Sequence, residues 1–414
     1  MTAVIVPDTP VTVPQSKISG SEFTGFDRLI QFGTDDHYPY YLRYDAGDEL
    51  PEVLGPLDTD LFVLVADAGL PPSMIAQTQR QITKVAPCTV LKFRGGEQAK
   101  NMATVQRLAR EAKLAGMTRR SAVVAFGGGC TANVAGFLSG VVFRGAPPLV
   151  QIPTTFENAF DAVLSWKQGV NLDDVKNLVG LYKRPELVWT DFAHMETLPR
   201  WELRAALCEW IKNTVGICPE HYGEVFTLLN PQGVYTPAQL ARICELNIEG
   251  KTRVMRNDPR EQRDGLVLEL GHTVGHALEL LAQLRHGFAI GIGLCIAARV
   301  GRLLGWLDES AEAAHYELLD RNGAPTRLPN GITPEQVLGV VAGDNKRGRL
   351  PVKPGHHVMV VLEQLGRPRR TDGLPLVHIP EKVLHAALRQ LASATCPSLR
   401  ALGHEQLWTP GEAS

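Results

Sequence analysis

The sequence lacks the features of several protein classes. Its 42 basic and 44 acidic residues leave a formal net charge of −2, and they form neither a basic stripe nor an acidic tail. We therefore expect no nucleic-acid partner and no attraction to an anionic membrane surface. No run of eighteen apolar residues occurs, since the longest candidate, 289–298, ends at Arg299, so we expect no membrane span. Any recognition of a phosphate group must therefore depend on a few polar or charged side chains at specific positions.

Cysteine is also scarce. The seven cysteines lie singly, without a C-x-x-C pair, at positions 88, 130, 208, 218, 244, 295 and 396. An odd, scattered set in a chain of this length is typical of reduced thiols. Residues 1–15 contain Asp8 and three prolines and have no basic start, so we expect no signal peptide. These features predict a cytoplasmic protein.

The first half of the chain alternates short apolar runs with amphipathic stretches. A chain of 414 residues can bury a sizeable core in each of two domains. We expect strands at 61–65, 89–93, 122–126 and 149–152, an extended segment at 37–42, and helices ending near 83 and covering 102–115 and 131–138. This rhythm is typical of an open, mostly parallel sheet.

Beyond about residue 199 the pattern becomes mainly helical. We expect helices at 201–215, 237–255, 266–284, 289–304 and 309–321, and the clearest strand pattern is at 357–362. We therefore predict an N-terminal tail (1–35), a Rossmann-like α/β domain (36–198), a mainly α-helical domain (199–400) and a C-terminal tail (401–414).

A glycine-rich turn follows the expected strand at 122–126. Gly127, Gly129 and Ala132 fit the pattern G-x-G-x-x-A, in which glycines let the backbone approach a pyrophosphate at a helix N-terminus. However, no acidic residue follows about twenty positions later to hold a ribose. Taken alone, the motif fits a tight strand-to-helix turn about as well as a nucleotide site.

Three of the twelve histidines fall within fifteen residues. His272 and His276 are four apart and share one helix face, and His286 follows. Imidazoles that converge in this way bind divalent metals such as Zn²⁺. The alternative is a set of surface or hydrogen-bonded core histidines. Poor helix formers at Gly271 and Gly287 favour the metal interpretation.

A third ligand is expected from another helix. Glu209 lies in an otherwise apolar helical stretch, where an unpaired charge is costly to bury. Lys212 follows three residues later on the same face, so a simple surface ion pair is the alternative.

Further polar residues are candidates for phosphate recognition. They are Arg144, Asp161, Lys167, Asn171, Lys176, Asn177 and the run 344–347. Taken singly, each is typical of a solvated side chain. Phosphate recognition requires several of them to converge, which sequence cannot establish.

Together and in this order, these segments resemble the dehydroquinate synthase superfamily of sugar-phosphate cyclases. The resemblance runs from about residue 37 to 366, and its landmarks are Gly127-Gly128-Gly129, Pro153-Thr154-Thr155, Asp161, Lys167, Val170-Asn171, Lys176-Asn177, Glu209-x-x-Lys212, Gly271-His272-Thr273-x-Gly275-His276 and His286-Gly287. Within the superfamily, the segments 37–41, 163–171 and 344–348, and Glu269 in place of an asparagine, are similar to the aminocyclitol-forming branch. His276 is intact, whereas valiolone-forming cyclases tend to lose it.

The resemblance implies roles for individual residues. The ligands of a divalent metal, Zn²⁺ or Co²⁺, would be Glu209, His272 and His286. NAD would contact Asp67, Glu97, Lys100, Gly128, Gly129, Asn133, Thr154, Thr155 and Lys176. Catalytic groups would be Asp161, Lys167, Lys212, Glu269 and His276, with Asn177 and Lys346 at the substrate phosphate. Arg144 resembles a family arginine that reaches a neighbouring subunit's phosphate site, which implies a homodimer.

The resemblance also implies a reaction. It is the conversion of D-glucose 6-phosphate to 2-deoxy-scyllo-inosose, by transient NAD-dependent oxidation, phosphate elimination, re-reduction and intramolecular aldol closure. Alternatives are a cyclase for another sugar phosphate, such as sedoheptulose 7-phosphate or the dehydroquinate precursor, a polyol dehydrogenase with the same fold, and a diverged or non-catalytic homologue.

Several positions depart from the family pattern. Phe288 replaces a glutamate expected to support the metal ligands, and such losses weaken metal affinity or rate by about 10–100-fold. The other departures are Ala132, the run 157–160, Trp166, Val175 and Ala206. Because the proposed ligands are all present, we expect the chemistry to be retained.

Overall fold

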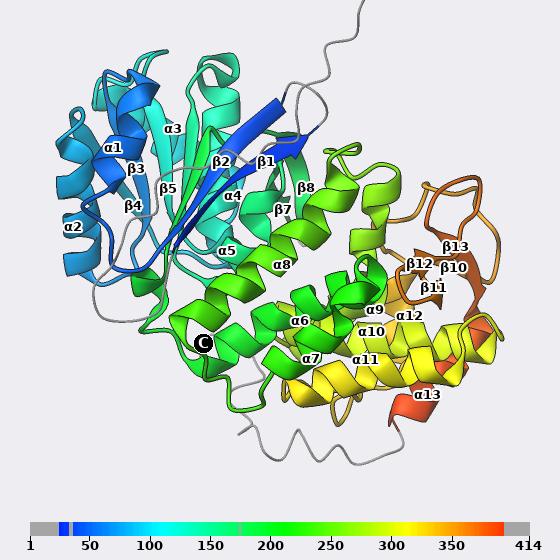
Figure 1. The fold of residues 1–414 in the computed structure, drawn as a ribbon. Coiled ribbons are helices and arrows are strands. Elements are labelled where there is room, and N and C mark those ends of the chain that lie inside the picture. The colour runs from blue at the N-terminus through cyan, green and yellow to red at the C-terminus, as the bar shows by residue number, and fades with distance from the viewer. Residues whose placement is uncertain (1–24, 33–35, 174, 393–414) are drawn as a thin grey trace, which may run out of the picture.

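A computed structural model describes residues 25–32, 36–173 and 175–392, and it has a sheet domain beside a helical domain (Figure 1). The main sheet has seven strands in the order β1-β2-β9-β6-β5-β3-β4, and β1 is antiparallel to β2 while the other pairs are parallel. The strands are β1 (Phe26–Phe32), β2 (Asp36–Arg43), β3 (Phe62–Asp67), β4 (Cys88–Phe93), β5 (Ala122–Gly127), β6 (Leu149–Pro153) and β9 (Leu187–Asp191). The predicted Rossmann-like parallel sheet is confirmed.

Helices cover both faces of this sheet. In β3, Val63 and Val65 pack in one apolar cluster with residues of α3 and α4, while Phe62 and Leu64 pack in another with residues of α1 and α2. Successive side chains of a strand point to opposite faces, so a strand covered on both sides is apolar throughout. These helices are α1 (Leu50–Leu54), α2 (Pro72–Thr83), α3 (Met102–Leu114) and α4 (Gly129–Val141).

Two structured segments were not expected from the sequence. Residues 26–32, which we assigned to the N-terminal tail, form β1, and Ile30 and Phe32 are buried against the core of the helical domain. Residues 167–182 form an antiparallel hairpin of β7 (Lys167–Leu172) and β8 (Val175–Tyr182). Both depend on pairing with a neighbouring strand, which composition does not reveal. Residues 1–24 and the predicted tail 401–414 lie outside the described residues.

The second domain is built from helices. They are α6 (Arg200–Gly216), α7 (Tyr222–Leu228), α8 (Pro237–Met255), α9 (His272–Ala282), α10 (His286–Leu303), α11 (Glu309–Arg321), α12 (Pro334–Val341) and α13 (Glu381–Ala392), with β10 (His356–Met359), β11 (Leu362–Gln364), β12 (Arg367–Pro368) and β13 (Val377–Pro380). Helix α5 (Phe156–Phe160) follows β6 in the first domain and packs against α6. Short 3₁₀ helices are η1 (Gly55–Leu57), η2 (Glu97–Ala99), η3 (Val142–Gly145), η4 (Ala162–Leu164), η5 (Phe192–Met195), η6 (Pro219–His221) and η7 (Asp264–Glu269). The last strand of the main sheet, β9, ends shortly before α6, near the boundary that we predict at residue 199.

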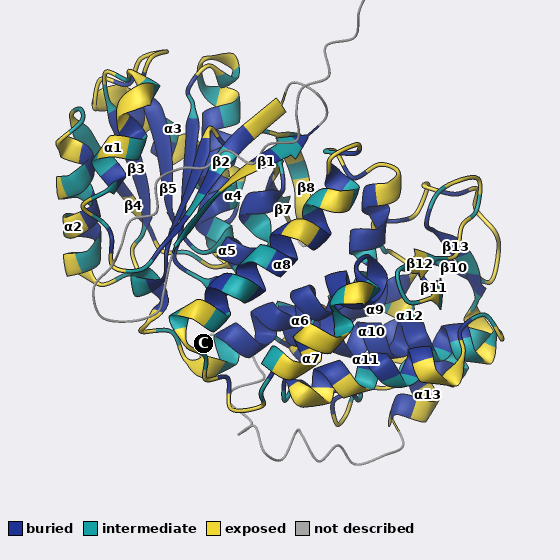
Figure 2. Ribbon diagram, in the orientation of Figure 1, coloured by how far each residue is buried: buried dark blue, intermediate teal, exposed yellow. Residues whose placement is uncertain are grey.

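Helix α10 is the centre of this domain. It has the length and hydropathy of a membrane span, but 78% of the window is buried among neighbouring helices, as in the core of a globular domain (Figure 2). Glycines allow the close approach: a Cβ at Gly287 would lie 1.8 Å from the Ala205 carbonyl oxygen on α6, and a Cβ at Gly293 would lie 2.0 Å from the Gly271 carbonyl oxygen.

The helix predicted at 266–284 is wrong as one element. Residues 264–269 form η7, and α9 begins at His272 after Gly271, whose φ of +80° is a left-handed conformation suited to glycine. The predicted strand 357–362 is likewise divided between β10 and β11. The break at Gly271 places His272 in the first turn of α9.

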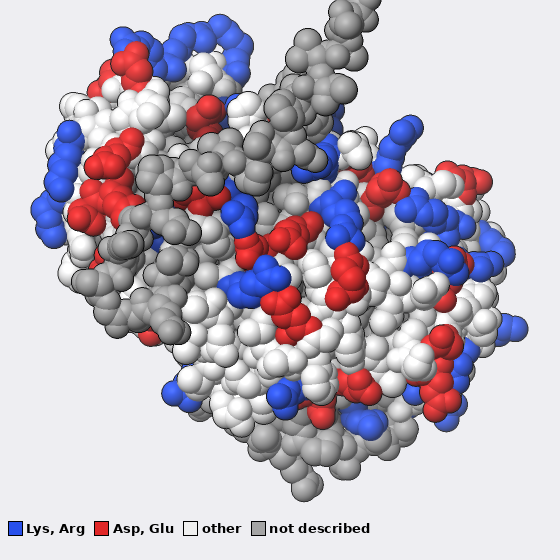
Figure 3. Space-filling model, in the orientation of Figure 1, with Lys and Arg blue, Asp and Glu red and all other residues white. Residues whose placement is uncertain are grey.

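The two domains share a continuous apolar core. The hydroxyl of Tyr40 on β2 donates to the carbonyl oxygen of Ala159 on α5 at 2.9 Å and lies 3.4 Å from Cys244 Sγ on α8. On the face shown in Figure 3, acidic and basic side chains are interspersed.

Candidate active site

Three predicted metal ligands from three helices converge. Glu209 lies on α6, His272 begins α9 and His286 begins α10. Glu209 Oε1 lies 3.6 Å from His272 Nε2 and 3.2 Å from His286 Nε2, and the three ligand atoms all lie within 4.8 Å of one another. The packing of α10 against α6 and α9 produces this convergence.

The other ring nitrogens are held by hydrogen-bond acceptors. His272 Nδ1 lies 3.2 Å from the Leu270 carbonyl oxygen, and His286 Nδ1 lies 3.1 Å from Glu279 Oε2. In each ring Nε2 is the atom that faces Glu209, and a bound ion would take the place of any proton there. A carboxylate and two imidazoles whose Nδ1 atoms are hydrogen-bonded form a ligand set that fits Zn²⁺ or Co²⁺. The residues therefore suit the divalent ion that the sequence predicts.

Burial and charge fix the protonation of this cluster. Burial lowers the pKa of His272 to about 3, so its imidazole is neutral at neutral pH. Burial also acts on His286, but Glu279 and Glu209 outweigh it and raise its pKa well above the ordinary value. Burial alone would raise the pKa of Glu209, yet Lys212 and the two histidines lower it strongly. Glu209 is therefore a carboxylate, the form that binds metal.

The Glu209–Lys212 pair is buried, so the surface-pair alternative is wrong. Lys212 Nζ donates to Glu209 Oε2, and the two side chains are 4% and 2% exposed. Nearby, Lys251 Nζ on α8 donates to Asp161 Oδ1 at 2.8 Å. Burial would raise the pKa of Asp161, but Lys251 and Lys212 lower it. Asp161 and Lys212 are thus charged groups beside the metal ligands.

A second cluster brings together residues predicted to hold phosphate and to move protons. Lys346 Nζ lies 3.2 Å from Glu269 Oε2 and 2.9 Å from Asp344 Oδ1. Lys167 Nζ lies 4.0 Å from Glu269 Oε1 and donates to Glu261. Two ammonium groups from distant segments therefore flank one carboxylate, as convergent phosphate recognition requires.

His276 joins this cluster to the metal ligands. Its ring centroid lies 5.2 Å from that of His272 and 6.2 Å from that of His286. Burial lowers the pKa of His276, so the ring is neutral. Burial would raise the pKa of Glu269, but Lys346 and His272 hold it well below its usual range. Glu269 and His276 are therefore both unprotonated at neutral pH.

Five of the predicted cofactor residues lie at or just beyond the carboxyl ends of adjacent parallel strands: Asp67, Gly128, Gly129, Thr154 and Thr155. Asp67 ends β3, Gly127 ends β5 and Thr154 follows β6, the edge where open α/β sheets bind nucleotides. Gly128 is the N-cap of α4 and Gly129 is its first residue; a Cβ at Gly129 would meet no atom within 4 Å. The free backbone there can face a pyrophosphate.

Hydrogen bonds order the loops and the hairpin next to this edge of the sheet. Asp67 Oδ1 accepts the Gly69 and Gly95 backbone N–H groups at 2.8 and 3.2 Å, so its carboxylate orders two loops. Asn133 Oδ1 accepts the Gly169 N–H at 3.0 Å. Thr155, the N-cap of α5, accepts the Asn158 N–H at 3.3 Å.

Asn171 links three predicted residues of the hairpin region. Its side chain donates to Glu97 Oε2 at 2.8 Å, its backbone N–H donates to the Lys100 carbonyl oxygen at 2.7 Å, and its Oδ1 accepts the Asn177 N–H at 2.9 Å. Asn177 thus contacts the hairpin, whereas Lys346 lies in the other cluster. Lys176 lies 3.3 Å from Glu279 on α9.

Arg144 lies apart from the site. It belongs to η3, where Phe143 and Arg144 both have positive φ, at 47° and 61°. No ion pair of Arg144 occurs among the residues that the structure describes. Within one chain, its guanidinium is therefore available to another molecule.

The family departures lie mostly in packed surroundings. Phe288 is fully buried in α10, and Ala206 is 2% exposed in α6. The Trp166 ring packs edge-on against Phe32, with centroids 5.0 Å apart. The position of the missing glutamate is thus a core position in this chain.

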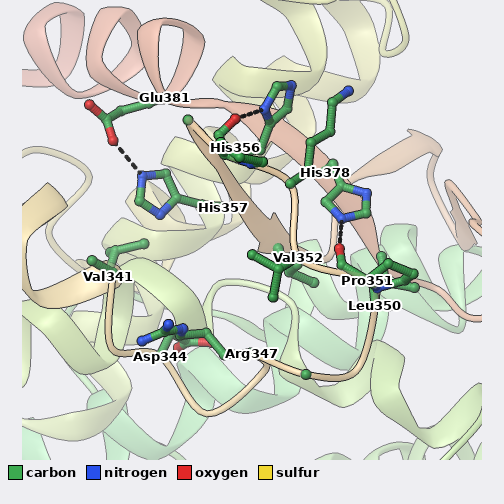
Figure 4. A pocket seen from close by; sticks show the side chains of 16 residues that line it. Val341, Asp344, Arg347, Leu350, Pro351, Val352, His356, His357, His378 and Glu381 are labelled. Carbon is green, nitrogen blue, oxygen red and sulfur yellow. Dashed lines mark hydrogen bonds and ion pairs between the residues drawn. The ribbon is translucent and has the colours of Figure 1, made fainter.

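A cavity of about 250 Å³ lies beside the Lys346 loop (Figure 4). Two of its histidines are paired: His357 Nε2 lies 3.3 Å from Glu381, and His378 Nε2 lies 2.7 Å from the Pro351 carbonyl oxygen. It shares Asp344 with the lysine cluster, but it is lined by none of the metal ligands. We place the chemistry at the ligand cluster and not in this cavity.

Sequence reasoning missed three charged residues of the site, Lys251, Glu261 and Glu279. The first two pair with Asp161 and Lys167 across the domain boundary. Glu279 lies seven residues after His272 and three after His276, on the same face of α9, which is the one sequence feature that could have identified it.

Known proteins share this sequence and architecture. The 3-dehydroquinate synthase N-terminal family model matches residues 90–205, and the C-terminal model matches residues 207–347. The 2-deoxy-scyllo-inosose synthase of Streptoalloteichus tenebrarius is 38% identical over 363 residues, covering 87% of this chain and 94% of the relative. That of Niallia circulans is 36% identical over 335 residues, covering 80% and 90%.

Solved structures agree. A 2-deoxy-scyllo-inosose synthase complexed with carbaglucose-6-phosphate, NAD⁺ and Co²⁺ is 33% identical, with a TM-score of 0.83 over 88% of this chain and 100% of that one. A 2-epi-5-epi-valiolone synthase from Streptomyces hygroscopicus, with NAD⁺ and Zn²⁺, shares the fold at 22% identity, with a TM-score of 0.72 over 86% and 97%. The chain belongs to the dehydroquinate synthase superfamily of sugar-phosphate cyclases.

Proposed function

We propose that this protein converts D-glucose 6-phosphate to 2-deoxy-scyllo-inosose with loss of phosphate, using NAD and a divalent metal. The observation that carries the proposal is the ligand set Glu209–His272–His286 beside a carboxylate, Glu269, flanked by two lysines. The names of the similar proteins, and the carbaglucose-6-phosphate, NAD⁺ and Co²⁺ bound by one of them, support the same substrate and cofactors.

Different residues of the site serve different steps of the proposed reaction. The bound groups would supply reversible hydride transfer at C4 and polarisation of the C4 oxygen. Lys167 and Lys346 bind the phosphate dianion and stabilise the charge that develops as it leaves. Glu269 and His276, both unprotonated at neutral pH, accept protons near the reacting carbons. Lys212 favours the charged form of Glu209, and Lys251 with Lys212 favours the charged form of Asp161.

The test is incubation with glucose 6-phosphate, NAD⁺ and Co²⁺. We expect one phosphate released per sugar, a six-membered carbocycle by mass spectrometry, and no net absorbance change at 340 nm, because the hydride is returned. Treatment with a chelator should abolish phosphate release, and Co²⁺ or Zn²⁺ should restore it.

Other outcomes identify the alternatives. Phosphate release from sedoheptulose 7-phosphate but not from glucose 6-phosphate would reject the proposed substrate while retaining cyclase chemistry. Net NADH accumulation with a polyol would indicate a dehydrogenase. NAD binding without phosphate release at any metal loading would indicate a non-catalytic homologue.

We also propose that the protein acts as a homodimer in the cytoplasm. No disulfide joins the cysteines of the described residues, which is consistent with a reducing compartment. The exposed Arg144 turn lies beside the hairpin, because Lys183 Nζ donates to the Gly145 carbonyl oxygen at 2.8 Å. Val141 and Phe143 are about 40% exposed there and supply apolar area for a second copy.

Subunit mixing tests whether Arg144 acts across the dimer. Arg144→Ala and His272→Ala chains should each release little phosphate, whereas a mixed dimer contains one site with both residues intact. We expect co-refolded mixtures to regain up to a quarter of wild-type activity, the share of intact sites that random pairing gives. If Arg144 serves its own chain, mixing will restore nothing; a monomer by light scattering would also reject the dimer.

A further inference from the structure

Glu279 contacts a metal ligand and the other domain at the same time. It lies on α9, and its Oε2 lies 3.1 Å from His286 Nδ1 on α10. Its Oε1 lies 3.3 Å from Lys176 Nζ on β8, in the hairpin of the α/β domain. The side chain of Glu279 is 11% exposed, so water competes little with either contact. One carboxylate thus joins three elements.

The contact with His286 determines which nitrogen faces the metal. An imidazole whose Nδ1–H donates to a carboxylate keeps its Nε2 lone pair for coordination, and this support makes the nitrogen a stronger donor. The Nε2 of His286 is the atom that lies 3.2 Å from Glu209 Oε1. Among the three ligands, His286 is the one supported by a charged acceptor, since His272 uses a backbone carbonyl oxygen.

The contact between Glu279 and His286 also explains how the site tolerates Phe288 in place of the glutamate of the family pattern. The side chain of Phe288 is fully buried in α10 and supplies no polar atom to the site. The carboxylate at His286 comes instead from the neighbouring helix. Although a phenylalanine replaces the glutamate at position 288, Nδ1 of His286 therefore still has an acidic partner, Glu279.

We propose that Glu279 is the positioning residue of the metal site, orienting His286 through Oε2 and tying it to Lys176 of the α/β domain through Oε1. This inference rests on the metal site of the proposed function. Lys176 is a predicted cofactor contact, so the same carboxylate links the helix that holds the metal to the hairpin beside the cofactor. Glu279 does not touch the reacting atoms and is not a catalytic residue.

The experiment measures Co²⁺ binding to the apoprotein by calorimetry and by the visible absorption of the bound ion. Glu279→Ala should weaken Co²⁺ binding about 10–100-fold and alter the absorption bands, because the orientation of one ligand is lost. Glu279→Gln keeps an acceptor for Nδ1–H without the charge, so it should fold normally and show a smaller loss. Lys176→Met removes only the Oε1 contact and should weaken Co²⁺ binding less than Glu279→Ala.

Glu111→Ala is the matched control. Glu111 forms an exposed ion pair with Arg107 on α3, at 2.7 Å, so its loss should leave Co²⁺ affinity and spectrum unchanged. Wild-type affinity and spectrum in both Glu279 variants, with only a lower melting temperature, would assign Glu279 a purely structural role and overturn the inference. Absence of Co²⁺ binding by the wild-type protein would reject the metal site itself, and with it this inference.

Discussion

Glu209→Gln is expected to remove the bound divalent ion and to lower phosphate release from glucose 6-phosphate by about a thousand-fold. The variant keeps the size of the side chain but loses the charge on which both histidines converge. A metal that polarises a substrate oxygen contributes several kcal/mol to the transition state, and about 4 kcal/mol corresponds to a thousand-fold in rate. Metal content by mass spectrometry and phosphate release by a colorimetric assay check the two effects.

The same substitution should also lower stability. Lys212 is buried with Glu209, and removing one partner of a buried ion pair leaves the other charge uncompensated, at a cost of about 3–5 kcal/mol. His272→Ala keeps the Glu209–Lys212 pair and should lose metal with a smaller change in melting temperature. If both variants retain one cobalt ion per chain and normal turnover, the ligand assignment is wrong.

Lys346→Met is expected to lower kcat/KM for glucose 6-phosphate by about 10–150-fold. A charge-assisted hydrogen bond to phosphate contributes about 1.5–3 kcal/mol, and Lys346 is 2% exposed, so water does not replace it. Much of the loss should appear in KM, because the phosphate is bound before it leaves. Steady-state phosphate release over a range of sugar concentrations measures both constants.

Lys353→Met provides the comparison for this variant. Lys353 follows seven residues later and is exposed, beside the separate cavity and away from Glu269. Its replacement should leave kcat/KM close to wild type. Equal kinetics for Lys346→Met and wild type would remove Lys346 from the phosphate site and leave Lys167 as the candidate cation.

The sheet and most of the helices could be predicted because their apolar patterns are local. Strands covered by helices on both faces are continuous apolar runs, and α8 begins at Pro237 with a capping box formed by Thr236 and Gln239. The strand β1 and the β7–β8 hairpin were missed because their pairing partners, and not their composition, determine them. The break at Gly271 was missed because the apolar pattern continues across it.

The convergence of Glu209, His272 and His286 could be predicted from residue type and spacing, together with the family resemblance. Histidines four apart share a helix face, and a lone glutamate in an apolar helix requires a partner. The charged partners of the other site residues could not be predicted in this way. Glu261 and Lys251 reach Lys167 and Asp161 from 94 and 90 residues away, so only the tertiary fold brings these charges together.

The glycines of α10 have a consequence for the ligand triangle. Where Gly287 and Gly293 meet the carbonyl oxygens of Ala205 and Gly271, main chain rests directly on main chain, with no side chain between. The separation of α6, α9 and α10 is thus set by contacts between backbones, and a side chain at either glycine would force the helices apart. The span between Glu209, His272 and His286 follows from that separation, so a larger residue at Gly287 or Gly293 would change the distances between the three ligand atoms.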